Sequence, residues 1–205
     1  MITIIDYGMG NLGSIQNMFK YIGVESTIEN DVDKIKNASK ILLPGVGSFD
    51  TAMKKINESD LKEVLNEKVL KEQIPVLGIC LGMQLLTNSS EEGNLEGLGW
   101  IDAKAINFKE KIDKGYGVPH MGWNIVNKSN DSQLTQGFEE FDESRFYFVH
   151  SYFVKVEDEK NSILKTSYGL EFDSAIQEDN IYGVQFHPEK SHKFGVKFFE
   201  NFAKI

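Results

Sequence analysis

The chain has 205 residues, of which 40% are hydrophobic, and a formal net charge of -9 at pH 7. This length and composition suffice for one sizeable core, so we expect a single domain over residues 1–205. The excess of acidic residues argues against nucleic acid or an anionic membrane surface as a partner. Cys80 is the only cysteine, which excludes a disulfide within the chain and favours a reducing, cytoplasmic setting.

The distribution of apolar residues excludes two further classes. Met1 leads directly into Ile2–Ile5 without a basic region or a cleavage site, so we expect no signal peptide. The longest uncharged stretch, from Ile74 to Ser90, contains a proline and ends in polar residues. It is too short and too polar to cross a bilayer, and we therefore expect a soluble protein.

The first 90 residues alternate between short apolar runs and amphipathic helical patterns. The expected strands are Ile2–Ile5, Val24–Ile28, Lys40–Leu43 and Ile74–Cys80. The helix after the third strand should begin behind Ser48 as its N-cap, and the next helix at Ser59 or Asp60. The order β-α-β-α-β-α-α-β-α implies a parallel sheet covered by helices, with ligands at the carboxyl ends of its strands.

The second half of the chain has a different pattern. Short β-type runs separated by turn residues occur at Ala103–Phe108, Asn124–Asn127, Phe146–Tyr152, Ile163–Tyr168, Ser174–Gln177 and Ile181–Phe186. They indicate a partly antiparallel extension of the sheet. A closing helix from about Ser191 places Phe194, Phe198, Phe199 and Phe202 on one face, which we expect in the core. The predicted fold class is α/β, with an open, mostly parallel sheet flanked by helices.

A reactive residue is expected in Gly78-Ile79-Cys80-Leu81-Gly82, which follows an apolar strand and precedes a helical pattern. A strand, a sharp turn with a nucleophile at its tip and a helix form a nucleophile elbow, here with cysteine in the serine position. Glycines are needed beside the tip because the backbone is crowded there. The alternative is a small buried core residue, since free cysteines are among the most buried residue types.

A base for such a nucleophile is available at His187, which follows the strand-like stretch Gly183–Phe186 and precedes Pro188 and Glu189. Glu189 can reach the imidazole nitrogen that faces away from the nucleophile, where it would fix the tautomer and stabilise imidazolium. Cys80, His187 and Glu189 would then form a catalytic triad. The alternative is a surface histidine beside a helix start, with Glu189 favourable only toward the helix dipole.

The loop Pro44-Gly45-Val46-Gly47 follows another strand, whose carboxyl end should face the same crevice as Cys80. Two glycines around a valine suit backbone amides presented to a developing negative charge. The alternative is an ordinary tight turn. No H-x-x-x-H or paired-cysteine spacing indicates a metal site, and Gly8 and Gly10 alone do not make a dinucleotide fingerprint. We therefore expect neither a metal nor a cofactor.

Three motifs together resemble the class I glutamine amidotransferases: Pro44-Gly45-Val46-Gly47, Gly78 to Gln84, and His187-Pro188-Glu189. Two further stretches, Asp6–Leu12 and Pro119–Asn124, resemble the glutaminase subunits of imidazole glycerol phosphate synthases. The resemblance covers essentially the whole chain. It implies a flavodoxin-like open sheet and a glutaminase that acts on L-glutamine.

The resemblance also implies a role for particular residues. Cys80 would attack the side-chain amide of glutamine and form a thioester, with His187 as general base and acid and Glu189 orienting it. The oxyanion hole would consist of the backbone N–H of Leu81 and one from the Val46–Gly47 peptide, which its glycines would allow to flip. The implied substrate contacts are Gln84, His150, Ser151 and Tyr152.

A partner is implied as well, namely a (β/α)8-barrel cyclase that forms a heterodimer with the glutaminase and receives ammonia through its interior. The implied interface residues are Asn11, Met121, Trp123 and Lys190. Trp123 as plain core is the alternative, since a large aromatic residue is core more often than anchor. Two positions depart from the family pattern: His192 stands where glutamine is common, and Gly117 where a basic residue is frequent.

The sequence is also compatible with two other functions. The same glutaminase chemistry could supply ammonia to a sugar-aminating partner in surface-polysaccharide biosynthesis, because the acceptor binds on the partner. A peptidase-like cysteine hydrolase on a related fold belongs to another enzyme class. Gln84 and the Pro44–Gly47 loop disfavour it.

Overall fold

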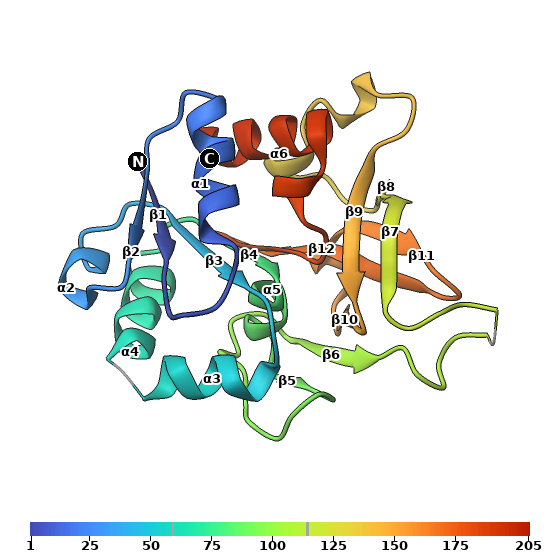
Figure 1. The fold of residues 1–205 in the computed structure, drawn as a ribbon, viewed down its shortest axis with the longest axis horizontal. Coiled ribbons are helices and arrows are strands. Elements are labelled where there is room, and N and C mark those ends of the chain that lie inside the picture. The colour runs from blue at the N-terminus through green and yellow to red at the C-terminus, as the bar shows by residue number, and fades with distance from the viewer. Residues whose placement is uncertain (59, 114) are drawn as a thin grey trace.

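The computed structural model describes residues 1–58, 60–113 and 115–205. Within these residues, eleven strands form one open sheet through the middle of the molecule (Figure 1). They are β1 (Ile2–Ile5), β2 (Ser26–Glu29), β3 (Ile41–Gly45), β4 (Val76–Cys80), β5 (Ser89–Ser90), β6 (Ala103–Asn107), β8 (Asn127–Lys128), β10 (Tyr152–Val156), β11 (Ser162–Ser167), β12 (Glu171–Glu178) and β13 (Ile181–Val184). A separate two-stranded sheet consists of β7 (His120–Ile125) and β9 (Arg145–His150).

The order of the strands confirms the predicted fold class. Along the sheet it is β2-β1-β3-β4-β13-β12-β10-β6-β5, with β11 paired to β12 and β8 paired to β11. The pairs from β2 through β4 to β13 are parallel, whereas β12 is antiparallel to β13 and to β10. The parallel half therefore comes mostly from the first 90 residues, and the antiparallel extension from the second half.

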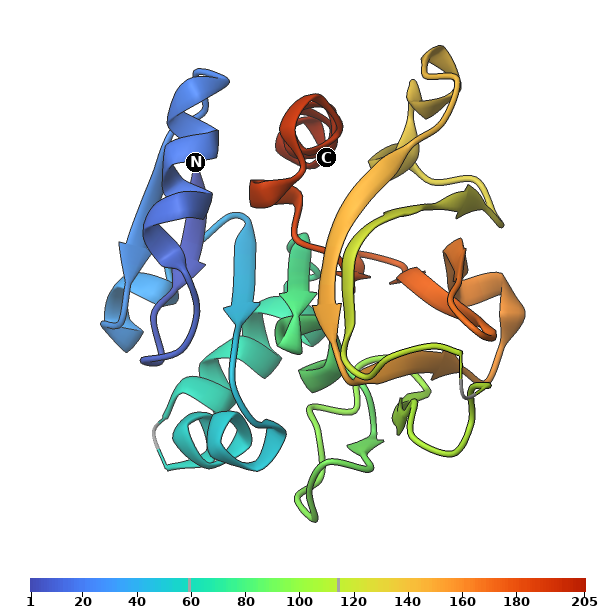
Figure 2. The same ribbon diagram turned by 45° about the vertical axis from the view of Figure 1, so that its right-hand side comes forward.

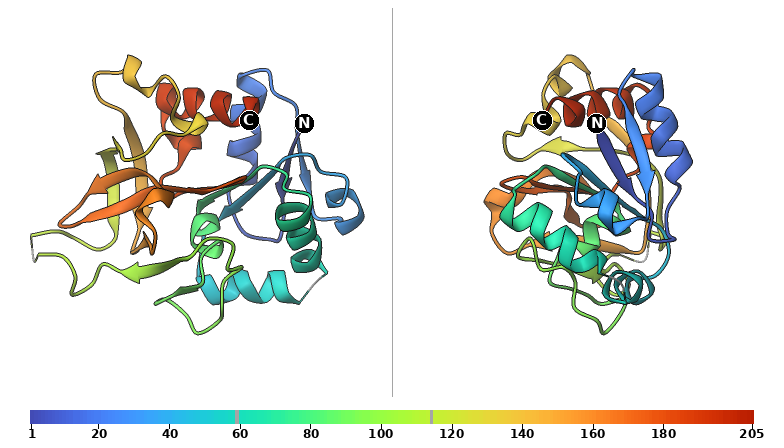
Figure 3. Two further views of the ribbon diagram at one scale, coloured as in Figure 1. Left: turned by 180° about the vertical axis from the view of Figure 1, so that it is seen from behind. Right: turned by 90° about the vertical axis from the view of Figure 1, so that its left-hand side faces the viewer.

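Helices cover both faces of this sheet. They are α1 (Leu12–Tyr21), α2 (Val32–Ile35), α3 (Phe49–Asn57), α4 (Leu61–Asn66), which continues as a π-helical turn over Glu67–Lys71, α5 (Leu81–Leu85) and α6 (His192–Lys204). Helices α1 and α6 lie on one face and α2 to α5 on the other, as two views from opposite sides show (Figures 1 and 3). Up to α5 the element order is the predicted one. None of the helices in the described ranges is long and apolar enough to cross a membrane.

The two faces of the sheet bury separate apolar clusters. The cluster beneath α1 and α6 contains Phe19, Phe198, Phe199 and Phe202, each with no exposed surface. The cluster on the other face contains Phe49, Met53, Ile56 and Leu65, also without exposed surface. The predicted aromatic face of the last helix is thus core, although Phe194 at its start is only half-buried. Sequestering apolar area on both faces is what holds a parallel sheet together.

Two predicted strands were placed wrongly. The strand predicted at Asn124–Asn127 is β7, which begins at His120 and ends at Ile125. The run predicted at Phe146–Tyr152 is divided at Ser151 into β9 and β10, which belong to different sheets. In Figure 2, β7 and β9 lie side by side as a curved ribbon beside the main sheet. Pairing between distant segments decides these boundaries, and local composition does not carry that information.

The predicted helix starts were correct in position but not in their capping. Ser48 is the N-cap residue of α3, yet its hydroxyl donates to Thr51 Oγ1 at 2.7 Å instead of capping the helix. The first backbone N–H of α3, that of Phe49, donates to Glu92 at 2.9 Å. Asp60 precedes α4, whereas the alternative start at Ser59 lies outside the described residues.

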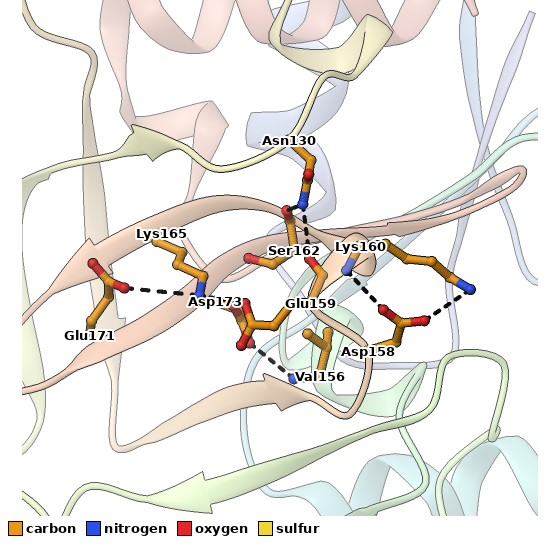
Figure 4. Close-up of polar contacts among 9 residues, drawn as sticks. All are labelled: Asn130, Val156, Asp158, Glu159, Lys160, Ser162, Lys165, Glu171 and Asp173. Carbon is orange, nitrogen blue, oxygen red and sulfur yellow. Dashed lines mark hydrogen bonds and ion pairs between the residues drawn. The ribbon is translucent and has the colours of Figure 1, made fainter.

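A polar network joins the antiparallel strands at the edge far from β1 (Figure 4). The buried Asp173 carboxylate on β12 accepts a hydrogen bond of 3.0 Å from the backbone N–H of Val156. Lys165 on β11 pairs with Glu159 at 2.6 Å and with Glu171 at 3.9 Å. The bond from Val156 satisfies the Asp173 carboxylate, which would be costly to bury alone, whereas the Lys165 pairs lie at the surface.

The crowding behind Cys80 generates a stability prediction. A Cβ at Gly82 on α5 would collide with the backbone carbonyl oxygen of Leu43 on β3. Both atoms belong to packed backbone, so neither can shift to relieve the collision. We expect Gly82→Ala to lower the free energy of unfolding by at least about 3 kcal/mol, measured by denaturant titration. Gly13 in α1 has no atom within 4 Å of its Cβ position, so Gly13→Ala should instead stabilise the protein by about 0.5–1 kcal/mol. Equal effects of the two substitutions would contradict this packing argument.

Candidate active site

Cys80 lies at the carboxyl end of β4, directly before α5, with φ 55° and ψ -111°. A non-glycine residue at positive φ is strained, and such strain is typical of a nucleophile elbow. Gly82 lets α5 lie against the end of β3, since its missing side chain leaves room for the Leu43 carbonyl. Cys80 is 7% exposed, so it is nearly buried, yet it lines the surface of a cleft.

His187 and Glu189 follow the neighbouring parallel strand, β13. Glu189 Oε1 lies 2.7 Å from His187 Nδ1, and both side chains are almost completely buried. His187 is fixed further by its own backbone, since its N–H donates to the Tyr147 carbonyl and its carbonyl accepts from the Ser191 hydroxyl. The imidazole therefore has one nitrogen bonded to a carboxylate and the other free to face the cleft.

The charge on His187 is set by its neighbours. Burial alone lowers the pKa of His187, but its interactions with Cys80 and Glu189 outweigh burial and raise the pKa to about 10. The approach of the Cys80 sulfur to the imidazole is the first of these raising effects, followed by the hydrogen bond with Glu189 and by the charges of both groups. At neutral pH the imidazole is therefore held as an imidazolium, which places a positive charge beside the Cys80 sulfur.

A cleft of about 310 Å³ opens over these groups. Its lining includes Cys80, His187 and the sequence-predicted residues Val46, Gly47, Leu81, Gln84, His150, Ser151, Tyr152 and Lys190. The structure thus brings the predicted nucleophile, base, oxyanion and substrate residues to one cavity. Its size and mixed lining suit a small polar molecule.

The predicted oxyanion loop, Pro44–Gly47, is held in place by the segment that follows β1. The buried hydroxyl of Tyr7 donates a 2.6 Å hydrogen bond to the Pro44 carbonyl, and burial raises the pKa of this phenol. Gly47 has φ 111°, which side chains rarely adopt, and a Cβ there would lie 2.7 Å from the end of Met9. Val46 is 45% exposed at the mouth of the cleft. A glycine is therefore required beside the predicted oxyanion peptide.

Gln84 on α5 connects the cleft wall to the strand next to Cys80. Its side-chain Nε2 lies 3.3 Å from the Tyr152 carbonyl and 3.1 Å from Gln185 Oε1. Gln185 follows β13 and has no exposed surface, and its Nε2 lies 3.7 Å from the Cys80 sulfur. The two side-chain amides thus form a row from the cleft wall to the Cys80 sulfur.

Two buried histidines support the same wall. His150 Nδ1 lies 2.7 Å from the Tyr152 carbonyl, and His150 Nε2 lies 2.9 Å from His120 Nδ1. Burial lowers the pKa of His150 to about 3 and that of His120 to about 4. Both rings are therefore neutral, and each must donate from one nitrogen and accept at the other.

The predicted interface residues lie on exposed surface. Met121 is 62% and Trp123 45% exposed on β7, so the alternative interpretation of Trp123 as core was wrong. The His192 ring stacks on Trp123 at 5.4 Å with an interplanar angle of 2°. Lys190 Nζ lies 5.7 Å from the centre of the Tyr147 ring at the edge of the cleft. Asn11 is exposed at the start of α1.

Two residues near the predicted site, one lining the cleft and one buried behind it, were not predicted from the sequence. Glu92 lines the cleft, but in the sequence it is one of two adjacent acids in a polar loop and carries no local signal. Gln185 precedes His187 by two residues, and only the parallel register of β13 with β4 brings it next to Cys80. Within the described residues, no group of three or more His, Cys, Asp or Glu side chains could hold a metal ion.

Comparison with known proteins agrees with this geometry. The family model "Glutamine amidotransferase class-I" matches residues 3–205. The chain is 57% identical to "Imidazole glycerol phosphate synthase subunit HisH 2" of Methanococcus maripaludis over 100% of this chain and 99% of that protein. It is 46% identical to the HisH subunit of Bdellovibrio bacteriovorus, with both chains covered completely. The chain belongs to the class-I glutamine amidotransferase family.

Solved structures support the same fold for this amidotransferase. A "glutamine amidotransferase" crystal structure superposes with a TM-score of 0.75 at 14% identity, covering 100% of each chain. The "PurLQS" structure from Thermotoga maritima gives a TM-score of 0.74 at 17% identity, covering 99% of this chain and 97% of that one. At these identities the likeness concerns the fold alone.

The two buried histidines generate a prediction about acid stability. A histidine has a pKa of about 6.5 in the unfolded chain, so below this pH the unfolded state binds more protons than the folded state. The free energy of unfolding therefore decreases as the pH is lowered. We expect His150 alone to cost about 2 kcal/mol between pH 6.5 and about pH 5. His187 acts oppositely, since its raised pKa gives stability that is complete below about pH 6.5 and lost as pH rises through about 10.

The measurement is the free energy of unfolding in urea at pH 7 and at about pH 5. In His150→Gln the decrease in the free energy of unfolding from pH 7 to about pH 5 should be smaller by about 2 kcal/mol than in the wild type, even though the variant is less stable at pH 7. His192→Gln changes an exposed ring and serves as the matched control with the wild-type slope. Equal slopes for wild type and His150→Gln would refute the neutral buried pair.

Proposed function

We propose that this protein is the glutaminase subunit of an imidazole glycerol phosphate synthase. It hydrolyses L-glutamine to glutamate and ammonia, and the ammonia passes to a cyclase subunit in histidine biosynthesis. The observation that carries the proposal is the His187–Glu189 pair at 2.7 Å, which shares one cleft with Cys80 in a chain of this family. The relatives named HisH support the choice of acceptor.

In the proposed mechanism the Cys80 thiolate attacks the side-chain carbonyl carbon of glutamine. His187, protonated at Nε2, gives its proton to the departing nitrogen, and ammonia leaves as the thioester forms. Neutral His187 then takes a proton from water, which attacks the thioester and releases glutamate. Glu189 keeps the imidazole in the required orientation and stabilises its positive charge in the resting state.

The tetrahedral intermediates carry a negative oxygen that needs donors. The backbone N–H of Leu81 at the start of α5 and an N–H of the Val46–Gly47 peptide are the proposed donors, and both residues line the cleft. Loss of one such donor typically costs about 3 kcal/mol of transition-state stabilisation. The orientation of this one peptide would therefore change the glutaminase rate by roughly a hundredfold.

Recognition of glutamine needs partners for its charged end. The Glu92 carboxylate in the cleft supports binding of the α-ammonium group, and Lys190 at the edge supports binding of the α-carboxylate. Gln84, His150, Ser151 and Tyr152 form the wall along which the side chain would lie. A site of this charge pattern favours a free amino acid over an extended peptide, which argues against the peptidase-like alternative.

The exposed strip on β7 is the proposed docking surface for a (β/α)8-barrel cyclase in a heterodimer. Met121 and Trp123 offer apolar area that is unusual on free surface, and Lys190 and Asn11 would lie at the same contact. Ammonia released beside the cleft would then enter the partner without passing through water. A thiolate nucleophile must remain reduced, which supports a cytoplasmic location.

The catalytic assignment predicts the outcome of a glutamate-release assay. We expect the purified protein to release glutamate from glutamine, and a cyclase with its nucleotide ligand to raise the rate by several orders of magnitude. Cys80→Ala should remove this activity because no other group can form the thioester. Lys36→Ala, on the exposed surface after α2, is the matched control with full activity. Stimulation by a different acceptor enzyme but not by the cyclase would contradict the histidine-pathway assignment.

The docking assignment predicts the effect of truncating Trp123. We expect Trp123→Ala to weaken cyclase binding by about 2 kcal/mol, or roughly thirtyfold in Kd, because a central aromatic anchor is lost. Tyr21→Ala removes an aromatic residue that is 78% exposed on α1 and is the control with unchanged affinity. Isothermal titration measures both. An unchanged Kd for Trp123→Ala would place the interface elsewhere.

A further inference from the structure

We propose that Gln185 is a further catalytic residue, whose side-chain amide donates a hydrogen bond to the Cys80 sulfur and stabilises the attacking thiolate. The proposal rests on the proposed role of Cys80 as nucleophile. Gln185 Nε2 lies 3.7 Å from Cys80 Sγ, within the range of an N–H···S hydrogen bond, and the side chain is fully buried. Gln185 is not a member of the proposed Cys80–His187–Glu189 triad, so its contact with the sulfur is a separate interaction.

The orientation of the Gln185 amide follows from its neighbours. Gln84 Nε2 can only donate, and it lies 3.1 Å from one end of the Gln185 amide. That end must therefore be the oxygen, which turns the NH2 group toward Cys80. The same Gln84 nitrogen has its second hydrogen available for the Tyr152 carbonyl at 3.3 Å. Gln84 thus decides which end of Gln185 the sulfur meets.

The Tyr152 carbonyl is itself held by the histidine pair. A carbonyl can only accept, so His150 Nδ1 carries its hydrogen toward Tyr152 at 2.7 Å. His150 Nε2 must then accept, and it does so from His120 Nδ1 at 2.9 Å. The His120 ring lies between Phe148 and Tyr168, at ring distances of 4.8 and 4.0 Å, and cannot turn freely.

Every polar group in this row therefore has one permitted orientation. It begins at His120 on β7 and passes through His150 and the Tyr152 carbonyl to Gln84 and Gln185. His120, His150 and Gln84 are positioning residues for the donor that touches the sulfur. Such a row costs no reorganisation when charge develops, which is the condition for strong electrostatic stabilisation.

The remaining titratable groups around the sulfur come from several elements. His187 after β13, with Glu189 bonded to it, supplies the positive partner. Tyr7 after β1 is buried, donates its hydroxyl to the Pro44 carbonyl and stays a neutral phenol near Cys80, since burial raises its pKa. His150 on β9 is neutral, and Glu92 in the loop after β5 also lines the cleft. Lys190, at the cleft edge, is the remaining cation among the lining residues.

His187 and Gln185 would stabilise the thiolate in different ways and at different steps. His187 attracts it by charge but is needed as a proton donor, so its help falls away once the proton moves to the leaving nitrogen. Gln185 cannot lose its protons and continues to donate, so it orients the sulfur toward the substrate carbon and stabilises it when it becomes the leaving group as the thioester breaks. Hydrogen bonding to a charged form lowers the free energy of that form.

The test is the rate of Cys80 alkylation by iodoacetamide as a function of pH, without glutamine or cyclase. Gln185→Met keeps the length of the side chain and removes the donor. We expect the inflection of the alkylation rate against pH to lie about one pH unit higher in Gln185→Met than in the wild type. Gln177→Met alters the same residue type on the adjacent strand β12, far from the sulfur, and is the matched control with the wild-type profile.

In the glutaminase assay with cyclase, Gln185→Met should lower kcat about tenfold and leave KM within about twofold, because the amide touches the sulfur and not the substrate. An alkylation profile identical to that of the wild type would overturn the proposal. The proposed glutaminase function fails separately, namely if Cys80→Ala retains activity.

A second measurement on the wild-type protein keeps the proposal testable if Gln185→Met does not fold. The Gln185 side-chain amide signals in the proton–nitrogen NMR spectrum should shift with the same pH inflection as Cys80 alkylation. They should lose this response in Cys80→Ala. Amide signals that ignore the state of Cys80 would show that no hydrogen bond joins them.

Discussion

The strained backbone at Cys80 is the constraint on which the site depends. A residue with φ 55° at the end of a buried strand is tolerated only because β3 and β13 on either side and α5 beyond it hold the backbone in place. Gly82 makes that fit possible, since any side chain there would enter the Leu43 carbonyl. The strained backbone thereby places the sulfur at the carboxyl edge of the sheet, where it projects into the cleft.

The parallel order of strands then determines which groups can reach the sulfur. The segments after β3, β4 and β13 meet at one edge of the sheet. The predicted oxyanion loop, the proposed nucleophile Cys80 and the His187–Glu189 pair therefore lie close together. The separate β7–β9 sheet supplies the opposite wall through His150 and places Met121 and Trp123 on the outside. The proposed chemistry and the proposed docking surface therefore share one strand pair.

Much of this could be predicted from local sequence, because the elbow and the His187-Pro188-Glu189 stretch carry their chemistry in adjacent residues. What could not be predicted depends on contacts between distant segments. In the sequence Glu92 is indistinguishable from a surface acid. Its place in the cleft depends on the loop after β5 and on its contact with the start of α3. Gln185 gains its position only from strand register. The division at Ser151 required knowledge of which strand pairs with which.

The central claim is that Cys80 forms a covalent intermediate with glutamine in this cleft. Rapid acid quench of the protein turning over glutamine with its cyclase, followed by peptide mass spectrometry, tests it most directly. We expect a γ-glutamyl thioester on the peptide that contains Cys80 and its absence from Cys80→Ala. Glutamate release without any adduct on Cys80, or with the adduct on another residue, would contradict the account.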